Sequence, residues 1–173
     1  GVNYAQTEYT LNVNSDHGAI TKTPGGAYHL NDVVALEATP VPGWTFIGWS
    51  GDITSANNPV DVIISGNMNI TANYAINTYT VTFDANTGSG TMSDQSVNYN
   101  VPTALTTNTF TRAGYTFSGW NTAANGSGTS YGNGASYNFT ADLTLYAQWT
   151  VNQYTITFDS DGGSTVDPIT QAV

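Results

Sequence analysis

Acidic side chains alternate in a short segment, Asp159-Ser160-Asp161-Gly162-Gly163, in the way that calcium-binding loops space their oxygen ligands. Similar pairs occur at Asp84 and Asn86 and at Asn14 and Asp16. A calcium ion needs about six to eight oxygen ligands, usually with a bidentate acid further along, and none follows at loop spacing. Asp and Asn also favour tight turns by bonding to their own backbone. We therefore interpret all three pairs as turn residues and predict no metal site.

Aromatic side chains are the next candidates, because a flat ring can stack on a sugar. The chain has 4 Trp, 11 Tyr and 6 Phe. Those that recur at equivalent positions of the repeat described below are interpreted as core residues. Trp44, Tyr131 and Tyr137 lie in or beside variable segments and are better candidates for exposed contacts, although half-burial is the expected outcome. The recurring set is Trp49, Trp120, Trp149 and Tyr74.

Residues for acid-base or covalent catalysis are not grouped in this sequence. His17 and His29 have no metal triad or nucleophile pair nearby, there is no Cys, and no Ser lies in a strand-turn-helix elbow. Two glycine-rich stretches, Gly126-Ser127-Gly128 and Gly132-Asn133-Gly134, lack the Lys that follows a phosphate-binding loop, so they are predicted to be hairpin turns. We expect no enzymatic activity, no catalytic residue and no cofactor.

Charge excludes further partners. Lys22 and Arg112 are the only cations against 12 carboxylates, which gives a formal net charge of -10 and a pI near 4.1. Nucleic acid is excluded because phosphate contacts need clustered Lys and Arg.

No apolar run approaches the roughly 18 residues of a membrane span, so no membrane insertion is expected. The lack of Cys excludes a disulfide scaffold and is compatible with an extracellular bacterial protein.

The elements that must position these side chains are organised around one repeated stretch. Gly43-Trp44-Thr45-Phe46-Ile47-Gly48-Trp49 recurs 71 residues later as Gly114-Tyr115-Thr116-Phe117-Ser118-Gly119-Trp120. The first aromatic residue and Phe alternate as one face of a strand requires, and the second Gly allows a bend or bulge before a large Trp. Each copy is predicted to be the core strand of one repeat.

Three similar strands open the repeats, and each alternates large apolar residues with Thr or Asn. Glycine-containing turns follow at residues 15–18, 85–88 and 160–163, which predicts three hairpins. The opening strands are Tyr9-Thr10-Leu11-Asn12-Val13, Tyr79-Thr80-Val81-Thr82-Phe83 and Tyr154-Thr155-Ile156-Thr157-Phe158.

The segment before each core strand has two interpretations. Residues 33–38 alternate like a strand, but Asn31-Asp32 could also cap a helical turn. Residues 100–106, with Pro102 near the start, fit a short helix or an irregular crossing. After each core strand come a variable loop, at residues 51–59 or 121–134, and a closing strand that ends on a large aromatic residue.

Three motifs in the second copy identify a family resemblance. Residues 79–150 closely resemble the Listeria-Bacteroides repeat, which is the B repeat of internalins, and residues 9–75 are similar to its divergent form. Residues 154–173 resemble the first third of another copy. The motifs are Tyr79-Thr80-Val81-Thr82-Phe83-Asp84, Arg112-Ala113-Gly114-Tyr115-Thr116-Phe117-Ser118-Gly119-Trp120 and Asp142-Leu143-Thr144-Leu145-Tyr146-Ala147-Gln148-Trp149.

The resemblance implies a mainly β fold, with a small α+β fold as an alternative, in tandem β-grasp-like modules that form an elongated array. The expected division is 1–8 as the end of a preceding repeat, 9–77 as a divergent repeat, 78–152 as a Listeria-Bacteroides-type repeat and 153–173 as the opening hairpin of a further, truncated repeat. No binding residue transfers with the resemblance.

The expected function is that of a structural spacer or stalk in a secreted or cell-surface bacterial protein, with adjacent repeats as its partners. Very short junctions at residues 75–78 and 150–153 favour this hypothesis. One alternative is an extracellular filament that self-associates by strand addition. Another is an adhesin that binds a glycan or a host protein through the variable loops.

Overall fold

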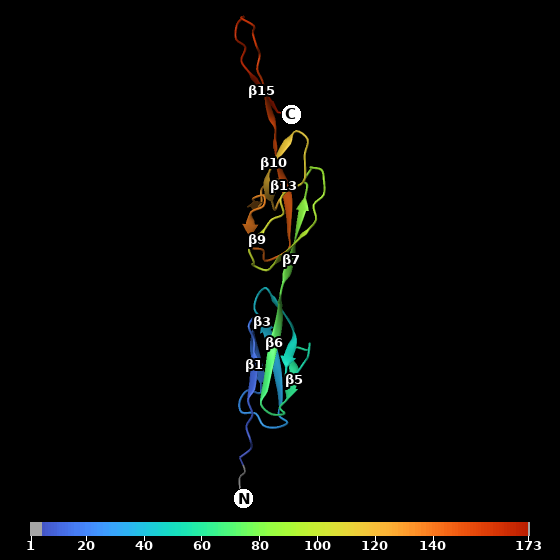
Figure 1. Ribbon diagram of the computed structural model, residues 1–173, viewed down its shortest axis with the longest axis vertical. Helices are drawn as coiled ribbons and strands as arrows, with labels where there is room; N and C mark the ends of the chain where they lie inside the picture. The colour runs from blue at the N-terminus through green and yellow to red at the C-terminus, as the bar shows by residue number, and fades with distance from the viewer. Residues whose placement is uncertain (1–4, 173) are drawn as a thin grey trace. The chain divides into compact units, whose positions relative to one another are not determined.

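A computed structural model describes residues 5–172, and within that range every regular element is a β-strand (Figure 1). The chain divides into two compact units, Gly1–Asn77 and Thr78–Val173, here called the first and second units. The prediction of a mainly β fold is confirmed. Neither segment before a core strand is helical: residues 33–38 lie in β3 (Val33–Pro40), whereas residues 100–106 form the irregular crossing, which includes only the two-residue β9 (Thr103–Ala104).

The main sheet of the first unit has three strands in the order β1-β6-β4. The opening strand β1 (Leu11–Asn14) pairs in parallel with the closing strand β6 (Met68–Ile76), and β6 pairs antiparallel with the core strand β4 (Trp44–Gly51). Alternate residues of β6, including Ile70 and Ala72, face inward, as the period of two along a strand requires. The first and last strands of this unit are therefore direct neighbours.

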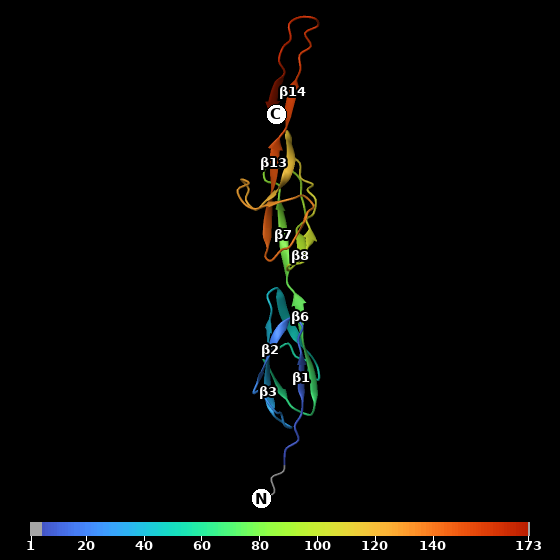
Figure 2. The same cartoon turned by 90° about the vertical axis from the view of Figure 1, so that its left-hand side faces the viewer.

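A second sheet covers the apolar face of the first. It contains β2 (Gly18–Thr23), β3 and β5 (Val60–Ile63) in the order β2-β3-β5. Figure 2 shows β1 and β6 on one side of the unit and β2 and β3 on the other. The buried side chains of both sheets meet in one cluster, whose largest fully buried side chains are Trp49, Leu36, Ile64, Ile70, Val34 and Val62.

The second unit repeats the main sheet and extends it at both edges. Its five strands have the order β11-β10-β13-β7-β8, in which β7 and β13 are the parallel opening and closing strands. A separate pair of short strands, β9 and β12 (Ser136–Tyr137), covers the core. The other strands are β7 (Thr78–Asp84), β8 (Gln95–Asn98), β10 (Tyr115–Asn121), β11 (Ser130–Tyr131) and β13 (Leu143–Val151).

Both core strands contain the bulge that their glycines predict. The pairing of β4 with β6 shifts register between Phe46 and Gly48, and the pairing of β10 with β13 shifts between Phe117 and Gly119. Both glycines have φ of 144°, a conformation that side-chain-bearing residues rarely adopt. The bulge places Trp49 and Trp120 in the cores, where they are 2% and 1% exposed.

Strands β14 (Gln153–Ile156) and β15 (Ile169–Ala172) form an antiparallel hairpin. Its large apolar side chains remain exposed: Tyr154, Ile156 and Phe158 are 46–55% exposed. Their counterparts in the first two repeats include Leu11, Val81 and Phe83, which are at most 7% exposed. The hairpin thus begins with the sequence of an opening strand, but within the described residues no core packs against its apolar side chains.

Two expectations from the sequence are wrong. The turn at residues 15–18 does not close a hairpin, because β1 and β2 lie in different sheets. Gly132-Asn133-Gly134 joins β11 to β12, which also belong to different sheets, so it is not a hairpin turn either.

Two further expectations stay predictions. The assignment of residues 1–8 to the end of a preceding repeat is not tested, because residues 1–4 lie outside the described residues and residues 5–8 form no strand. The β-grasp arrangement implied by the resemblance stays an expectation, because the described chain has no helix for its strands to wrap.

Candidate functional site

Two of the three pairs of acidic and amide residues form a local turn through a side-chain hydrogen bond, while Asn14 ends β1 and Asp16 lies in the bend that follows it. The Asp159 Oδ1 accepts a hydrogen bond from the Asp161 backbone N–H at 3.0 Å, and the Asp84 Oδ1 accepts one from the Asn86 backbone N–H at 2.7 Å. These bonds are the contacts that turn propensity predicts. Among residues 5–172, no three His, Cys, Asp or Glu side chains are grouped closely enough to hold a metal ion.

The recurring aromatic residues belong to the cores or their edges. Trp49 and Trp120 are buried, while Trp149 and Tyr74 are half-buried at equivalent positions. The Trp149 indole donates to the Ala85 carbonyl at 3.0 Å, and the Tyr74 hydroxyl shares a 2.8 Å hydrogen bond with the Ser15 hydroxyl. These contacts fix the closing strand against the turn that follows the opening strand.

The three aromatic residues beside variable segments are half-buried, as expected. Tyr131 and Tyr137 pack edge to face with ring centroids 4.6 Å apart, and the Tyr137 hydroxyl accepts a hydrogen bond from the Gly132 N–H. Trp44 stacks on the His17 ring at 3.4 Å. Each ring is thus engaged within its own unit.

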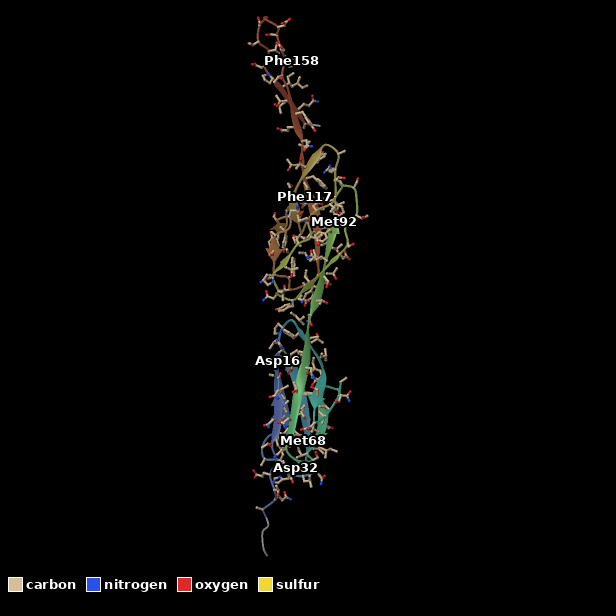
Figure 3. The ribbon with its side chains drawn as sticks, viewed as in Figure 1. Asp16, Asp32, Met68, Met92, Phe117 and Phe158 are labelled. Atoms are coloured by element: carbon tan, nitrogen blue, oxygen red, sulfur yellow. The ribbon has the colours of Figure 1, made fainter. Side chains whose placement is uncertain are left out.

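The two histidines are each held by a neighbouring carboxylate. The His17 Nδ1 lies 2.9 Å from the Asp16 Oδ1, and the hydrogen bond from His17 is the main cause that lowers the pKa of Asp16 below its usual value of 3.8. His29 is paired with Asp32, which accepts a hydrogen bond from its backbone N–H at 2.7 Å. Asp16 and Asp32 lie toward opposite ends of the first unit (Figure 3), so the histidines do not form a joint site.

A hollow lies on the outer face of β6 in the first unit, and we call it the β6 groove. Its volume is about 720 Å³. Its walls are the turn that follows β1 and the bulge of β4, and its floor is β6 itself. The residues that line it include Asn14, Asp16, Ile47, Thr71, Asn73 and Tyr74.

Sequence reasoning did not find this groove. Asp16 was interpreted only as a turn residue, and Tyr74 as a recurring core residue rather than a sugar-stacking platform. The signal that could have found the groove is the unequal length of the variable loops. A loop that covers a surface in one repeat and is shorter in the other leaves that surface open.

The junction after each closing strand is a single residue with the same contacts in both units. The Asn77 N–H donates to the Gly43 carbonyl at 2.8 Å, and its Oδ1 accepts from the Thr45 hydroxyl at 2.6 Å. Asn152 makes the equivalent bonds to Gly114 and Thr116, at 2.8 Å and 2.7 Å. Each asparagine is thereby fixed to the core strand of the unit that it ends.

Family comparison matches both units. Residues 79–148 match the Listeria-Bacteroides repeat domain, and residues 9–78 match the divergent InlB B-repeat domain. The chain belongs to the Listeria-Bacteroides repeat family. The resemblance stated from the sequence motifs is confirmed, with the divergent copy first and the closer copy second.

Relatives of this repeat chain are considerably longer proteins. This chain is 32% identical over 171 residues to a Gly-rich protein of Evansella cellulosilytica that is labelled as a membrane protein. The aligned region covers 89% of this chain and 19% of that relative. Another E. cellulosilytica protein labelled as a membrane protein is 33% identical and is matched over 85% of this chain and 24% of its own length. Internalin H of Listeria monocytogenes is 47% identical over 60 residues, which are 35% of this chain and 11% of that protein.

These comparisons place the chain among tandem repeats that internalin-type surface proteins carry. The chain spans about a fifth to a quarter of the length of the two E. cellulosilytica relatives. Across residues 5–172 there is no helix of the length and apolarity that a membrane crossing demands.

Proposed function

We propose that this chain is a spacer segment of a secreted or surface-attached bacterial protein, in which successive repeats form a semi-rigid stalk. The observation that carries the proposal is the junction between repeats. Only Asn77 separates β6 from β7, and only Asn152 separates β13 from β14. A flexible linker needs several free residues, whereas each junction residue here is bonded to its own unit.

The order of strands within each unit also suits a stalk. Because β1 and β6 are parallel neighbours, a force that pulls the two ends of the first unit apart slides these strands past each other. All their hydrogen bonds then bear the force together instead of opening one at a time. The parallel pair β7 and β13 gives the second unit the same property.

The junction can be tested by single-molecule energy transfer. The chain has no Cys, so Glu37→Cys and Ser127→Cys place one dye on an exposed residue of each unit. We expect a narrow distance distribution that broadens when six Gly-Ser residues are inserted after Asn77. A native chain whose distribution is as broad as that of the insertion variant would contradict the spacer proposal. Asn77→Ala should broaden the distribution less than the insertion, because it removes only the side-chain bond from Thr45.

A second candidate function is self-assembly by strand addition, and the β14-β15 hairpin favours it. Its apolar residues are exposed where their counterparts in both units are buried or half-buried, so another segment could complete a core on it. That segment would come from a further copy of the chain. Light scattering over a concentration series should then show growth beyond the 18.2 kDa monomer, and a concentration-independent monomer would exclude this function.

A further inference from the structure

The variable loops differ in length by five residues. In the first unit Trp49 is bridged to Ser55, six residues later, and in the second unit Trp120 is paired with Tyr131, eleven residues later. The longer loop of the second unit forms a flap, residues 122–129, whose ends are joined by a hydrogen bond from the Thr122 N–H to the Thr129 carbonyl.

The flap rests on the part of the second unit that corresponds to the β6 groove. The Asn86 side-chain amide donates to the Ala124 carbonyl of the flap at 2.7 Å and to the Ala147 carbonyl of β13 at 2.8 Å. The Gln148 amide lies 3.3 Å from the Ala123 carbonyl. Glycine is favoured at position 126, because its φ is 78° and a Cβ there would lie 2.9 Å from the Gln148 Oε1, so that the Gln148 side chain would have to shift.

The same positions have no flap in the first unit, where the Asn73 amide donates instead to the Gly48 carbonyl at 3.1 Å and to the Ser50 hydroxyl at 2.9 Å. The parallel pairing of the opening and closing strands aligns Asp16 with Asn86 and Asn73 with Gln148. The five-residue-shorter loop supplies no flap, and these two residues instead line the β6 groove with Ile47. The second unit therefore shows, within the same chain, what kind of group fits this surface: a short backbone segment of small residues.

The key difference between the two surfaces is that a hydrogen-bond donor in the second unit is replaced by an acceptor in the first. Asn86 donates to a flap carbonyl, whereas the Asp16 carboxylate can only accept. Asp16 is exposed, and its contact with His17 favours the charged form. An occupant of the first groove must therefore offer a donor or a positive charge where the flap offers a carbonyl oxygen.

We propose that the β6 groove of the first unit binds a short peptide segment of another protein, made of small residues and carrying a Lys or Arg that pairs with Asp16. This goes beyond the spacer function, which requires no ligand. A sugar fits the groove less well, because the only aromatic residue among its lining residues is Tyr74, which is half-buried with its hydroxyl bonded to Ser15. The strongly acidic chain, with a formal net charge of -10, also favours a basic partner.

Two synthetic peptides test the proposal against the full-length chain. One has the flap sequence Thr122-Ala123-Ala124-Asn125-Gly126-Ser127-Gly128 with blocked ends, and the other carries Lys in place of Ala124. Titration to about 1 mM, followed by amide chemical shifts, should move the signals of Asp16, Ile47 and Asn73. The Lys peptide should bind about two- to fivefold more tightly, as expected of one exposed ion pair, and this preference should disappear in 1 M salt.

Variants distinguish the groove from the rest of the surface. Ile47 and Ile63 are 58% and 62% exposed but lie in different sheets of the first unit. Ile47→Arg should abolish peptide binding, because the new side chain enters the groove and pairs with Asp16, whereas Ile63→Arg should leave binding unchanged. Asp16→Asn recreates the amide of the second unit and should reverse the preference toward the unmodified peptide.

The proposal is overturned if neither peptide moves these signals, if Ile47→Arg and Ile63→Arg behave alike, or if Asp16→Asn keeps the Lys preference. Chitohexaose at the same concentration serves as the sugar probe. Shifts at the groove with this sugar and none with the peptides would assign the groove to a glycan and overturn the peptide assignment. None of these outcomes bears on the junctions, so the spacer proposal stands or falls separately.

Discussion

The first and second units share a three-strand frame but cover it differently. The frame is β1-β6-β4 in the first unit and β7-β13-β10 in the second, with the same parallel pair, the same bulge and the same junction bonds. In the first unit a three-stranded sheet covers the frame, with six paired positions between β2 and β3. In the second unit the cover is reduced to two paired positions between β9 and β12, together with loops.

The comparison shows that the frame, rather than the cover, determines where the core tryptophan lies. Trp49 and Trp120 are buried to almost the same extent under the two different covers. What the cover changes is the polar environment of the indole. The Trp49 Nε1 donates to the Asn57 carbonyl at 2.9 Å, whereas the Trp120 Nε1 has no partner among the described residues.

The largest expected effect comes from removal of the core tryptophans. Trp49→Ala and Trp120→Ala should each destabilise their own unit by about 3–5 kcal/mol, because each leaves a large cavity. A unit of this size has little stability to spare, so it should unfold while the other unit keeps its dispersed amide spectrum. Simultaneous loss of both spectra in either variant would show that the units are not independent.

The bulge glycines should respond in the same direction but to different extents. Gly48→Ala and Gly119→Ala place a Cβ at φ of 144°, which costs about 1–3 kcal/mol. The effect should be larger at Gly48, where the Cβ would lie 3.0 Å from the Ser55 carbonyl oxygen, than at Gly119, where the nearest oxygen is 3.3 Å away. Urea unfolding of the two variants tests the order. Gly25→Ala is the control with ordinary contacts of 3.7 Å, and an equal loss there would refute the explanation.

The flap gives a sharper test of the difference between the units. Asn86→Asp keeps a residue that tolerates the observed φ of 46° but removes the donor to two carbonyls, which should cost about 1–3 kcal/mol. Amide hydrogen exchange in residues 123–126 should accelerate. The reciprocal variant Asp16→Asn should leave the unfolding midpoint of the first unit nearly unchanged, because no flap rests there. Unaltered exchange in Asn86→Asp would mean that the flap is held by other contacts.

The smallest expected effect is a pH dependence confined to the first unit. Because the hydrogen bond from His17 lowers the pKa of Asp16 in the folded state, its stabilising contribution is present above the ordinary value of 3.8 and is lost as the pH falls through the lower folded value. The second unit has Asn86 and Thr87 at these positions and should lack this titration. Carboxyl chemical shifts measure it directly, and His17→Gln should move the Asp16 pKa upward. An Asp16 pKa that does not change in this variant would exclude His17 as the cause.

The sequence predicted the frame because its signals are local. Alternating residues identified β4 and β10, and the glycine at the sixth position of each repeated stretch predicted the bulge that the register shifts confirm. The closing strands were expected from the same alternation, although β6 continues past Tyr74 to Ile76.

The pairing partners and the groove depend on contacts between residues distant in sequence. The turn at residues 15–18 has hairpin composition, yet β1 pairs with β6, more than fifty residues later, and β2 pairs with β3. A turn signal fixes where a strand ends but not which strand it joins. Likewise, the groove at Asp16 and Asn73 exists because a distant loop is short, which no local pattern reveals.

Force spectroscopy on the full chain tests the spacer account most directly. When the chain is pulled from its two ends, β1 slides along β6 and β7 along β13, so we predict two separate high-force unfolding events, one for each unit. Attachment at Val41→Cys and Thr78→Cys instead peels the antiparallel pair β4 and β6 one bond at a time, and the first unit should then open at a clearly lower force. An end-to-end unfolding force no higher than the peeling force would contradict the proposal that this repeat chain serves as a spacer under tension.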